Sequence, residues 1–121
     1  ILDDKKNLKK IVKIVHLEIK RKLNLFLIQN KSKKIVILDI PLLLENKINR
    51  KKDFLIFVQT KKLDVLKRLK KRKNYNKKLL DRFRNIQLSL DYKRKKSDFI
   101  IKNNFTKKMI KKGINIVLKK I

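Results

Sequence analysis

Two acidic residues on either side of a proline are the first candidates for a chemical role in this sequence. Residues 34–45 read KIVILDIPLLLE, in which Asp39 ends an apolar run, Pro41 closes it and Glu45 follows. An apolar run without polar alternation is typical of a strand buried on both faces of a parallel sheet, and proline ends such a strand because it lacks a backbone donor. The acids would then lie at the carboxyl edge, where open α/β sheets bind ligands. On pattern alone, a core strand followed by an acidic loop is the favoured interpretation.

Two arginines, Arg68 and Arg72, lie four residues apart in a helix that we expect to begin after Thr60 as its N-cap. Side chains at this spacing leave one face of a helix. Two guanidinium groups there could bind triphosphate oxygens in a bidentate manner. From the spacing alone, two solvated arginines in a lysine-rich helix are the simpler interpretation.

Asn103 follows an expected strand over residues 98–101. Its amide can both donate and accept hydrogen bonds, which suits an adenine edge, and asparagine is also common in turns because it tolerates left-handed geometry. Both interpretations stay open. We interpret Phe105 and several other phenylalanines as core residues on apolar faces rather than as a surface on which bases stack.

Alternating helices and strands must position these residues. Helical spacing of apolar residues predicts one or two helices over 4–29. Strands separated by helices favour an α/β fold with a parallel sheet. The expected elements are strands over 34–40, 54–59 and 98–101, helices after the N-caps Thr60, Asn76 and Thr106, and a basic connection over 93–96.

Length and composition bound the protein class. With 121 residues the chain is one domain or part of one. Because it has no cysteine and a single histidine, disulfides, thiolate nucleophiles and histidine clusters are excluded. No apolar run reaches the length of a membrane span and no signal peptide is visible, so a cytoplasmic protein is expected. The chain begins at Ile1 within a predicted helix, and we therefore expect it to be incomplete at its amino end.

The net charge of +28 raises the possibility of a nucleic-acid partner. The basic residues are mostly lysines scattered along every segment, and alanine is absent, which indicates a compositional bias. We favour a solvated lysine-rich surface that attracts phosphates generally. A small basic RNA-binding or ribosome-associated protein is the alternative.

Three ordered motifs are similar to those of one enzyme family. The segments are VILDIPLLLE at 36–45, LKRLKKR at 66–72 and QLSLDYKRKKSDFIIKNN at 87–104. Together they resemble dephospho-CoA kinase, the last enzyme of coenzyme A synthesis. The positions that match are Pro41, Leu42, Leu43 and Glu45 in the first, Arg68, Leu69 and Arg72 in the second, and Gln87, Lys93, Asp98, Ile101 and Asn103 in the third, with His16 where the family has a His-Pro pair.

The resemblance implies a P-loop kinase-like fold, with a three-layer parallel sheet and a helical lid over about 61–96. Residues 1–121 would be the carboxyl-terminal portion of one such domain. It implies that Arg68 and Arg72 close a lid over ATP and that Asn103 contacts the ATP base. Asp39, at the end of an apolar strand, resembles the acid that helps hold Mg²⁺ in phosphate-loop proteins, although many members of this family lack an acid there. The acceptor-substrate residues that the resemblance implies are Pro41, Leu42, Leu43, Glu45, His16, Gln87 and Lys93. The implied partners are ATP and dephospho-CoA, with no specific nucleic acid and no membrane; the sequence does not give the oligomeric state.

Several of these residues have a plain structural alternative. His16 is more often a packed or capping histidine, and Leu17 stands where the family has proline. For Glu45 the alternative is a surface acid in a basic chain, although we favour the functional role. For Lys93 a solvated cation within a basic run is equally plausible.

The family's phosphate-binding loop has no counterpart in this sequence. A G-x-x-x-x-G-K-[ST] loop needs two glycines, and Gly113 is the only glycine. In the family this loop and the catalytic aspartate lie upstream, so we expect the chain to be inactive alone. Once complete, it would transfer the γ-phosphate of ATP to the 3′-hydroxyl of dephospho-CoA. Another P-loop kinase, acting on a nucleoside or a nucleotide, is a further alternative.

Overall fold

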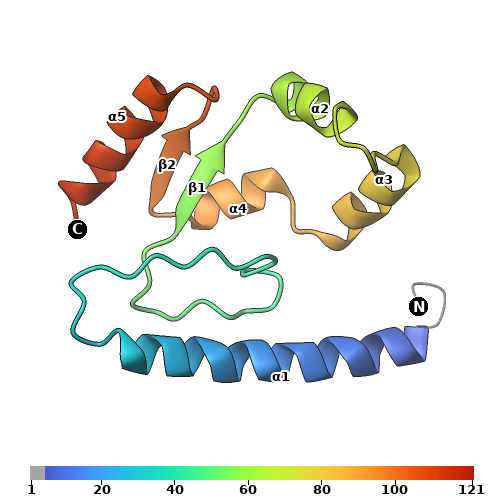
Figure 1. Ribbon diagram of the computed structural model, residues 1–121, viewed down its shortest axis with the longest axis horizontal. Coiled ribbons are helices and arrows are strands. Elements are labelled where there is room, and N and C mark those ends of the chain that lie inside the picture. Colours follow the sequence, from blue (N-terminus) through green and yellow to red (C-terminus); the bar gives the residue numbers. More distant parts are fainter. Residues whose placement is uncertain (1–4) are drawn as a thin grey trace. The chain divides into compact units, whose positions relative to one another are not determined.

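The structure is a computed structural model that describes the backbone of residues 5–121 and the side chains from Ile14 onward. The chain divides into two compact units, residues up to Ile48 and residues from Asn49 on, and each is described by itself. In chain order the elements are α1 (Lys5–Gln29), β1 (Ile56–Gln59), α2 (Lys62–Lys70), α3 (Lys77–Ile86), α4 (Leu90–Lys96), β2 (Phe99–Lys102) and α5 (Lys107–Leu118) (Figure 1).

The first unit consists of α1 and the irregular segment that follows it. α1 confirms the helix predicted over 4–29 from Lys5 on, and Asp4 lies outside the described residues. The predicted strand over 34–40 was wrong, because this segment is irregular and pairs with no strand among the described residues. An apolar run becomes a strand only where a neighbouring backbone supplies the hydrogen bonds, and Ile37 is left 85% exposed here.

A tight turn follows that segment over residues 41–47. Leu42 and Lys47 adopt left-handed backbone angles, with φ of 56° and 51°. Leu42 O accepts from Asn46 N over 3.0 Å, and Leu43 O accepts from Ile48 N over 3.1 Å. The turn therefore folds back the end of the segment that resembles the family's first motif, and it is followed by Ile48, which is buried.

The second unit is built on a parallel pair of strands. β1 and β2 confirm the predicted strands over 54–59 and 98–101, and Ile56 pairs with Phe99 at the start of the ladder. The connection between the strands runs through α2, α3 and α4, as a crossover between parallel strands requires. Both strands therefore present their carboxyl ends at one edge (Figure 1).

Asp98 joins the amino ends of the two strands. Leu55 N donates to Asp98 Oδ2 over 2.7 Å, and Leu55 O accepts from Asp98 N over 2.8 Å. The rings of Phe54 and Phe99 meet beside this junction with centroids 5.9 Å apart. The ladder thus has a fixed starting point.

Side-chain caps begin most of the helices in this unit. Asn76 Oδ1 accepts from Leu79 N over 3.1 Å and Thr106 Oγ1 accepts from Met109 N over 3.4 Å, which confirms both predicted N-caps. Thr60 is not a cap, because α2 begins after Lys61 without a side-chain hydrogen bond.

The predicted basic connection over 93–96 is helical instead. It belongs to α4, which begins where Ser89 Oγ accepts from Tyr92 N over 3.2 Å. Lysine and arginine are good helix formers, and basic side chains in a last turn suit the helix dipole. The cap therefore decides that this short run is a helix.

α5 lies beside β2 and covers it (Figure 1). Ile101 of β2 and Val117 of α5 are only 8% and 5% exposed. Gly113 allows the helix this close, because a Cβ there would lie 2.7 Å from Ile101 Cγ2. This contact is the centre of the small core of the second unit.

The described residues form an α/β structure with a two-stranded parallel sheet. This confirms the α/β class and the parallel pairing predicted from the sequence. None of the helices over residues 5–121 combines the length and apolar character that crossing a membrane requires.

Candidate functional site

The carboxyl edge of the sheet brings together two of the predicted site residues of the second unit, Asn103 and Arg68. Asn103 follows β2 directly, and its backbone N–H donates to Gln59 O over 2.8 Å, which extends the ladder by one bond. Asn103 is half-buried, and its Oδ1 accepts from Phe105 N over 2.7 Å. The Asn103 side chain therefore shapes the turn after β2, as the turn interpretation predicted, and its contact with a base stays a prediction.

Phe105 brings Arg68 to this edge. The Arg68 Cζ atom lies 3.7 Å from the centroid of the Phe105 ring, well within the range of a cation–π contact. Arg68 comes from α2 and Phe105 from the turn between β2 and α5. The sequence interpretation of Phe105 as a core residue was wrong, since it is 37% exposed and its ring contacts an arginine. The sequence offered one sign that Phe105 lies near the site, which is its position two residues after Asn103.

Arg72 does not share a helix face with Arg68. α2 ends at Lys70, and Arg72 lies in the following turn, where its N–H donates to Leu69 O over 3.0 Å. The i, i+4 argument needs a helix that spans both residues, so it fails for this pair. Both side chains are nevertheless exposed and belong to one unit.

Gln87 and Lys93 lie at the end of α3 and within α4. Gln87 is an exposed helix C-cap whose N–H donates to Arg84 O over 3.2 Å. Lys93 is half-buried, and its backbone oxygen accepts from Ser97 Oγ over 2.8 Å. Both residues belong to the helical connection between the two strands.

The other predicted site residues belong to the first unit. His16 is half-buried on α1, and Asp39 is exposed in the irregular segment that follows α1. Pro41, Leu42, Leu43 and Glu45 form the turn that follows, in which Leu43 and Glu45 are half-buried. Within the described part of the chain no three acidic, histidine or cysteine side chains gather as metal ligands, so Asp39 stands without a ready-made cluster.

Local charge pairs shape α1 and the start of the second unit. Arg21 donates two hydrogen bonds to the Glu18 carboxylate, at 2.7 and 2.9 Å, and this interaction holds the pKa of Glu18 below its ordinary value. Arg50 pairs with Asp53 at 3.2 Å. These exposed pairs join near neighbours on the surface, where such pairs contribute little to stability.

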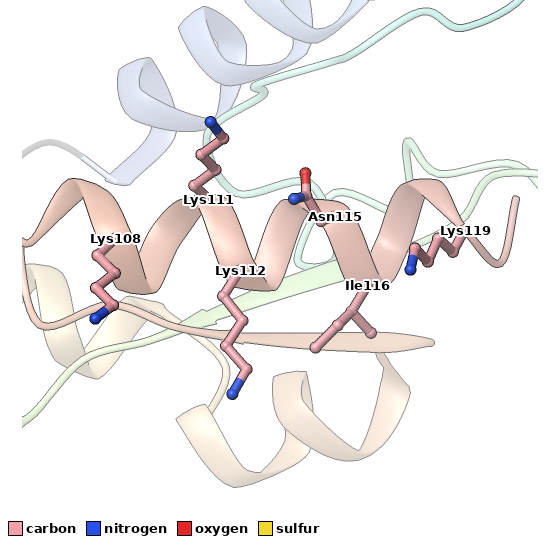
Figure 2. Close-up of a pocket in the computed structure, with 6 residues that line it drawn as sticks. All are labelled: Lys108, Lys111, Lys112, Asn115, Ile116 and Lys119. Atoms are coloured by element: carbon pink, nitrogen blue, oxygen red, sulfur yellow. The ribbon is translucent and has the colours of Figure 1, made fainter.

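Figure 2 shows a shallow hollow of about 390 Å³ along α5. Lys111 and Lys112 point to opposite sides of the helix in this view. Its lining side chains spread apart rather than converge on one point, which is typical of a solvated basic surface. The residues lining it are Lys108, Lys111, Lys112, Asn115, Ile116 and Lys119.

Comparison with known proteins shows the family to which this chain belongs. The sequence profile of the dephospho-CoA kinase family matches residues 1–108, so the chain belongs to this family. A dephospho-CoA kinase from Wolbachia sp. subsp. Brugia malayi is 35% identical over 111 residues, which cover 90% of this chain and 56% of the relative. Those from Wolbachia pipientis wMel and Listeria innocua are 36% and 34% identical, over 86% of this chain and 54% and 53% of the relatives. The chain thus spans about half the length of these curated relatives.

Proposed function

We propose that this chain supplies the lid and acceptor segments of an ATP-dependent kinase that phosphorylates the 3′-hydroxyl of dephospho-CoA. The observation that carries the proposal is the meeting of Arg68 and the Asn103 turn at the carboxyl edge of two parallel strands, in a chain of this family. The domain would be a three-layer P-loop kinase fold, with residues 61–96 as its lid.

The reaction balances as a simple displacement. The 3′-oxygen of the acceptor forms a bond to the γ-phosphorus while the bond from that phosphorus to the β,γ-bridging oxygen breaks, so that ADP leaves and the hydroxyl proton goes to a base outside this chain. Catalysis of this kind depends on positioning and on neutralising charge. Arg68 and Arg72 would supply that charge on the ATP side, and Asn103 would contact the base.

The turn after Asp39 would face the acceptor. Pro41, Leu42 and Leu43 offer apolar contacts, while Glu45 and His16 offer polar ones. Gln87 and Lys93 would contact bound substrate from the lid. Mg²⁺ is usually held by one or two carboxylates together with substrate phosphates, so Asp39 would hold it only in the presence of ATP, where the ion neutralises phosphate charge.

A chimaera tests this function. We expect that joining the phosphate-loop-bearing part of the Wolbachia sp. relative to this chain gives ATP-dependent formation of CoA, measured as product with dephospho-CoA as the acceptor. Arg72→Ala in the chimaera should lower turnover at least about tenfold, because arginines that neutralise a transferring phosphoryl group contribute strongly to its transition state. Arg94→Ala, at an exposed position of α4, is the matched control and should leave turnover within about twofold.

The same assay separates the alternatives. The intact relative serves as the positive control, and a cooperative thermal unfolding transition shows that the chimaera folds. A folded chimaera that phosphorylates nucleosides or nucleoside monophosphates but not dephospho-CoA would identify a different kinase. A folded chimaera in which the Arg72 variant turns over as fast as the parent would remove the proposed lid role.

A further inference from the structure

Phe105 occupies a backbone conformation that bulky side chains rarely adopt. Its φ is +64°, in the left-handed region that glycine enters freely. Asn103 Oδ1 accepts from the Phe105 N–H over 2.7 Å and so holds the turn in this conformation. Such an outlier justifies asking what the residue does.

Burial of the ring does not account for a phenylalanine at this position. The residue remains 37% exposed, whereas the core contact of this unit joins Ile101 to Gly113 and α5. What the ring does supply is the contact with Arg68, whose Cζ lies 3.7 Å from the ring centroid. The turn therefore directs an aromatic surface toward an arginine of α2.

The geometry of this contact leaves the arginine able to bind an anion. A cation–π contact uses a face of the guanidinium group, whereas its five N–H donors point outward within the plane of the group. Arg68 can thus be held by the ring while its donors remain directed toward solvent and ligand. A freely rotating arginine would instead lose side-chain entropy when it binds.

We propose that Phe105 is a positioning residue that holds Arg68 at the carboxyl edge of the sheet before nucleotide binds. The inference rests on the proposed role of Arg68 at the triphosphate of ATP. Phe105 itself touches no substrate and acts through Arg68, and Asn103 acts in turn by fixing the Phe105 backbone. Removing the ring should therefore weaken ATP binding at Arg68 while the chain remains folded.

Because the backbone at Phe105 is left-handed, Phe105→Gly removes the ring at a position where glycine fits the backbone. Glycine fits this φ, so relief of backbone strain should offset part of the free energy lost with the contacts of the ring, and the variant should remain folded. Phe105→Trp keeps a ring and should restore the contact, and Phe105→Leu keeps apolar bulk but has no ring. Far-UV circular dichroism on heating shows whether each variant folds.

The contact and its consequence are measured on the full 121-residue chain by NMR. In the parent, the ring current of Phe105 should shift the Arg68 side-chain protons upfield, and Phe105→Gly and Phe105→Leu should remove that shift. Titration with ATP should then perturb the Arg68 Nε–H signal at a half-saturation about three- to tenfold lower in the parent than in either variant. Arg94, on α4, is the internal control, and its response to ATP should be the same in all variants.

The outcomes are distinct. Loss of the ring shift with a weaker ATP response at Arg68 alone, both restored by Phe105→Trp, supports the proposal. The proposal is overturned if the Arg68 side-chain protons of the parent show no upfield shift. It is also overturned if the half-saturation for ATP at Arg68 is the same with and without the ring, or if Arg68 shows no saturable response to ATP. Failure of the proposed kinase function is read separately, as absence of CoA formation by the folded chimaera.

Discussion

Asp98 belongs to a segment that resembles a kinase motif, yet its carboxylate has a structural contact, a hydrogen bond with the backbone of Leu55. Its Oδ2 accepts from Leu55 N over 2.7 Å, and its backbone N–H donates back to Leu55 O. The pair sets the start of the register in which Ile56 lies opposite Phe99. Because the carboxyl ends of the strands depend on that register, Asp98 helps position Asn103 from the opposite end of β2.

Asp98→Ala should lower the free energy of unfolding by about 1 kcal/mol, because it removes a charge-assisted hydrogen bond at an exposed site. Urea unfolding followed by circular dichroism measures the change. Asp98→Asn, which keeps an acceptor oxygen, should recover at least half of it. The matched control is Asp81→Ala, since Asp81 is exposed and its ion pair with Arg84 is 3.9 Å long. If the Asp98 and Asp81 variants were equally stable, the hydrogen bond from Leu55 to Asp98 would not stabilise the strand pair.

At the scale of elements, helix ends decide which side chains can act together. α2 stops at Lys70, so Arg68 projects from a helix while Arg72 lies in a turn. α5 extends to Leu118 although the family match ends at residue 108. The helix that covers β2 therefore lies largely beyond the matched region, and its packing depends on this chain's own residues.

Gly113→Ala should destabilise the second unit by about 1 kcal/mol. A Cβ at this position would lie 2.7 Å from Ile101 Cγ2, and overpacking of this kind costs about 1–3 kcal/mol, against about 1 kcal/mol gained from helix propensity. Thermal unfolding measures the difference. Asn115→Ala, at an exposed position of the same helix, controls for propensity and should be neutral or slightly stabilising. A Gly113→Ala variant more stable than the parent would show that α5 and β2 separate easily.

At the scale of the whole molecule, the main feature of the surface is its positive charge. The net charge of +28 is spread over all segments, and the lysines on α5 point apart rather than toward one ligand. Such a surface attracts polyanions without selecting among them. It therefore does not by itself indicate a nucleic-acid function.

RNA binding by this chain should weaken on the order of 10–100-fold between 50 and 200 mM salt, as expected for about three to five phosphate contacts on a single strand. Fluorescence anisotropy with two RNAs of equal length and unrelated sequence measures both affinity and preference. We expect the two curves to coincide at every salt concentration. Salt-resistant binding to one of the RNAs would support the RNA-binding alternative.

The sequence predicted the local features well because they depend on near neighbours. The N-caps Asn76 and Thr106 are confirmed, as are the long first helix and the strands after Asp53 and Ser97. The ordered motifs predicted the family, and the family match confirms it. The roles assigned to individual site residues remain predictions.

The sequence alone determined which side chains are present, where helices are capped and which family the chain resembles, since each of these is written in short spacings. Only the tertiary structure decided what depends on a distant partner. It leaves residues 34–40 unpaired, because a strand needs a second backbone. It also sets Arg68 over Phe105, 37 positions along the chain, because the turn fixed by Asn103 directs the ring there.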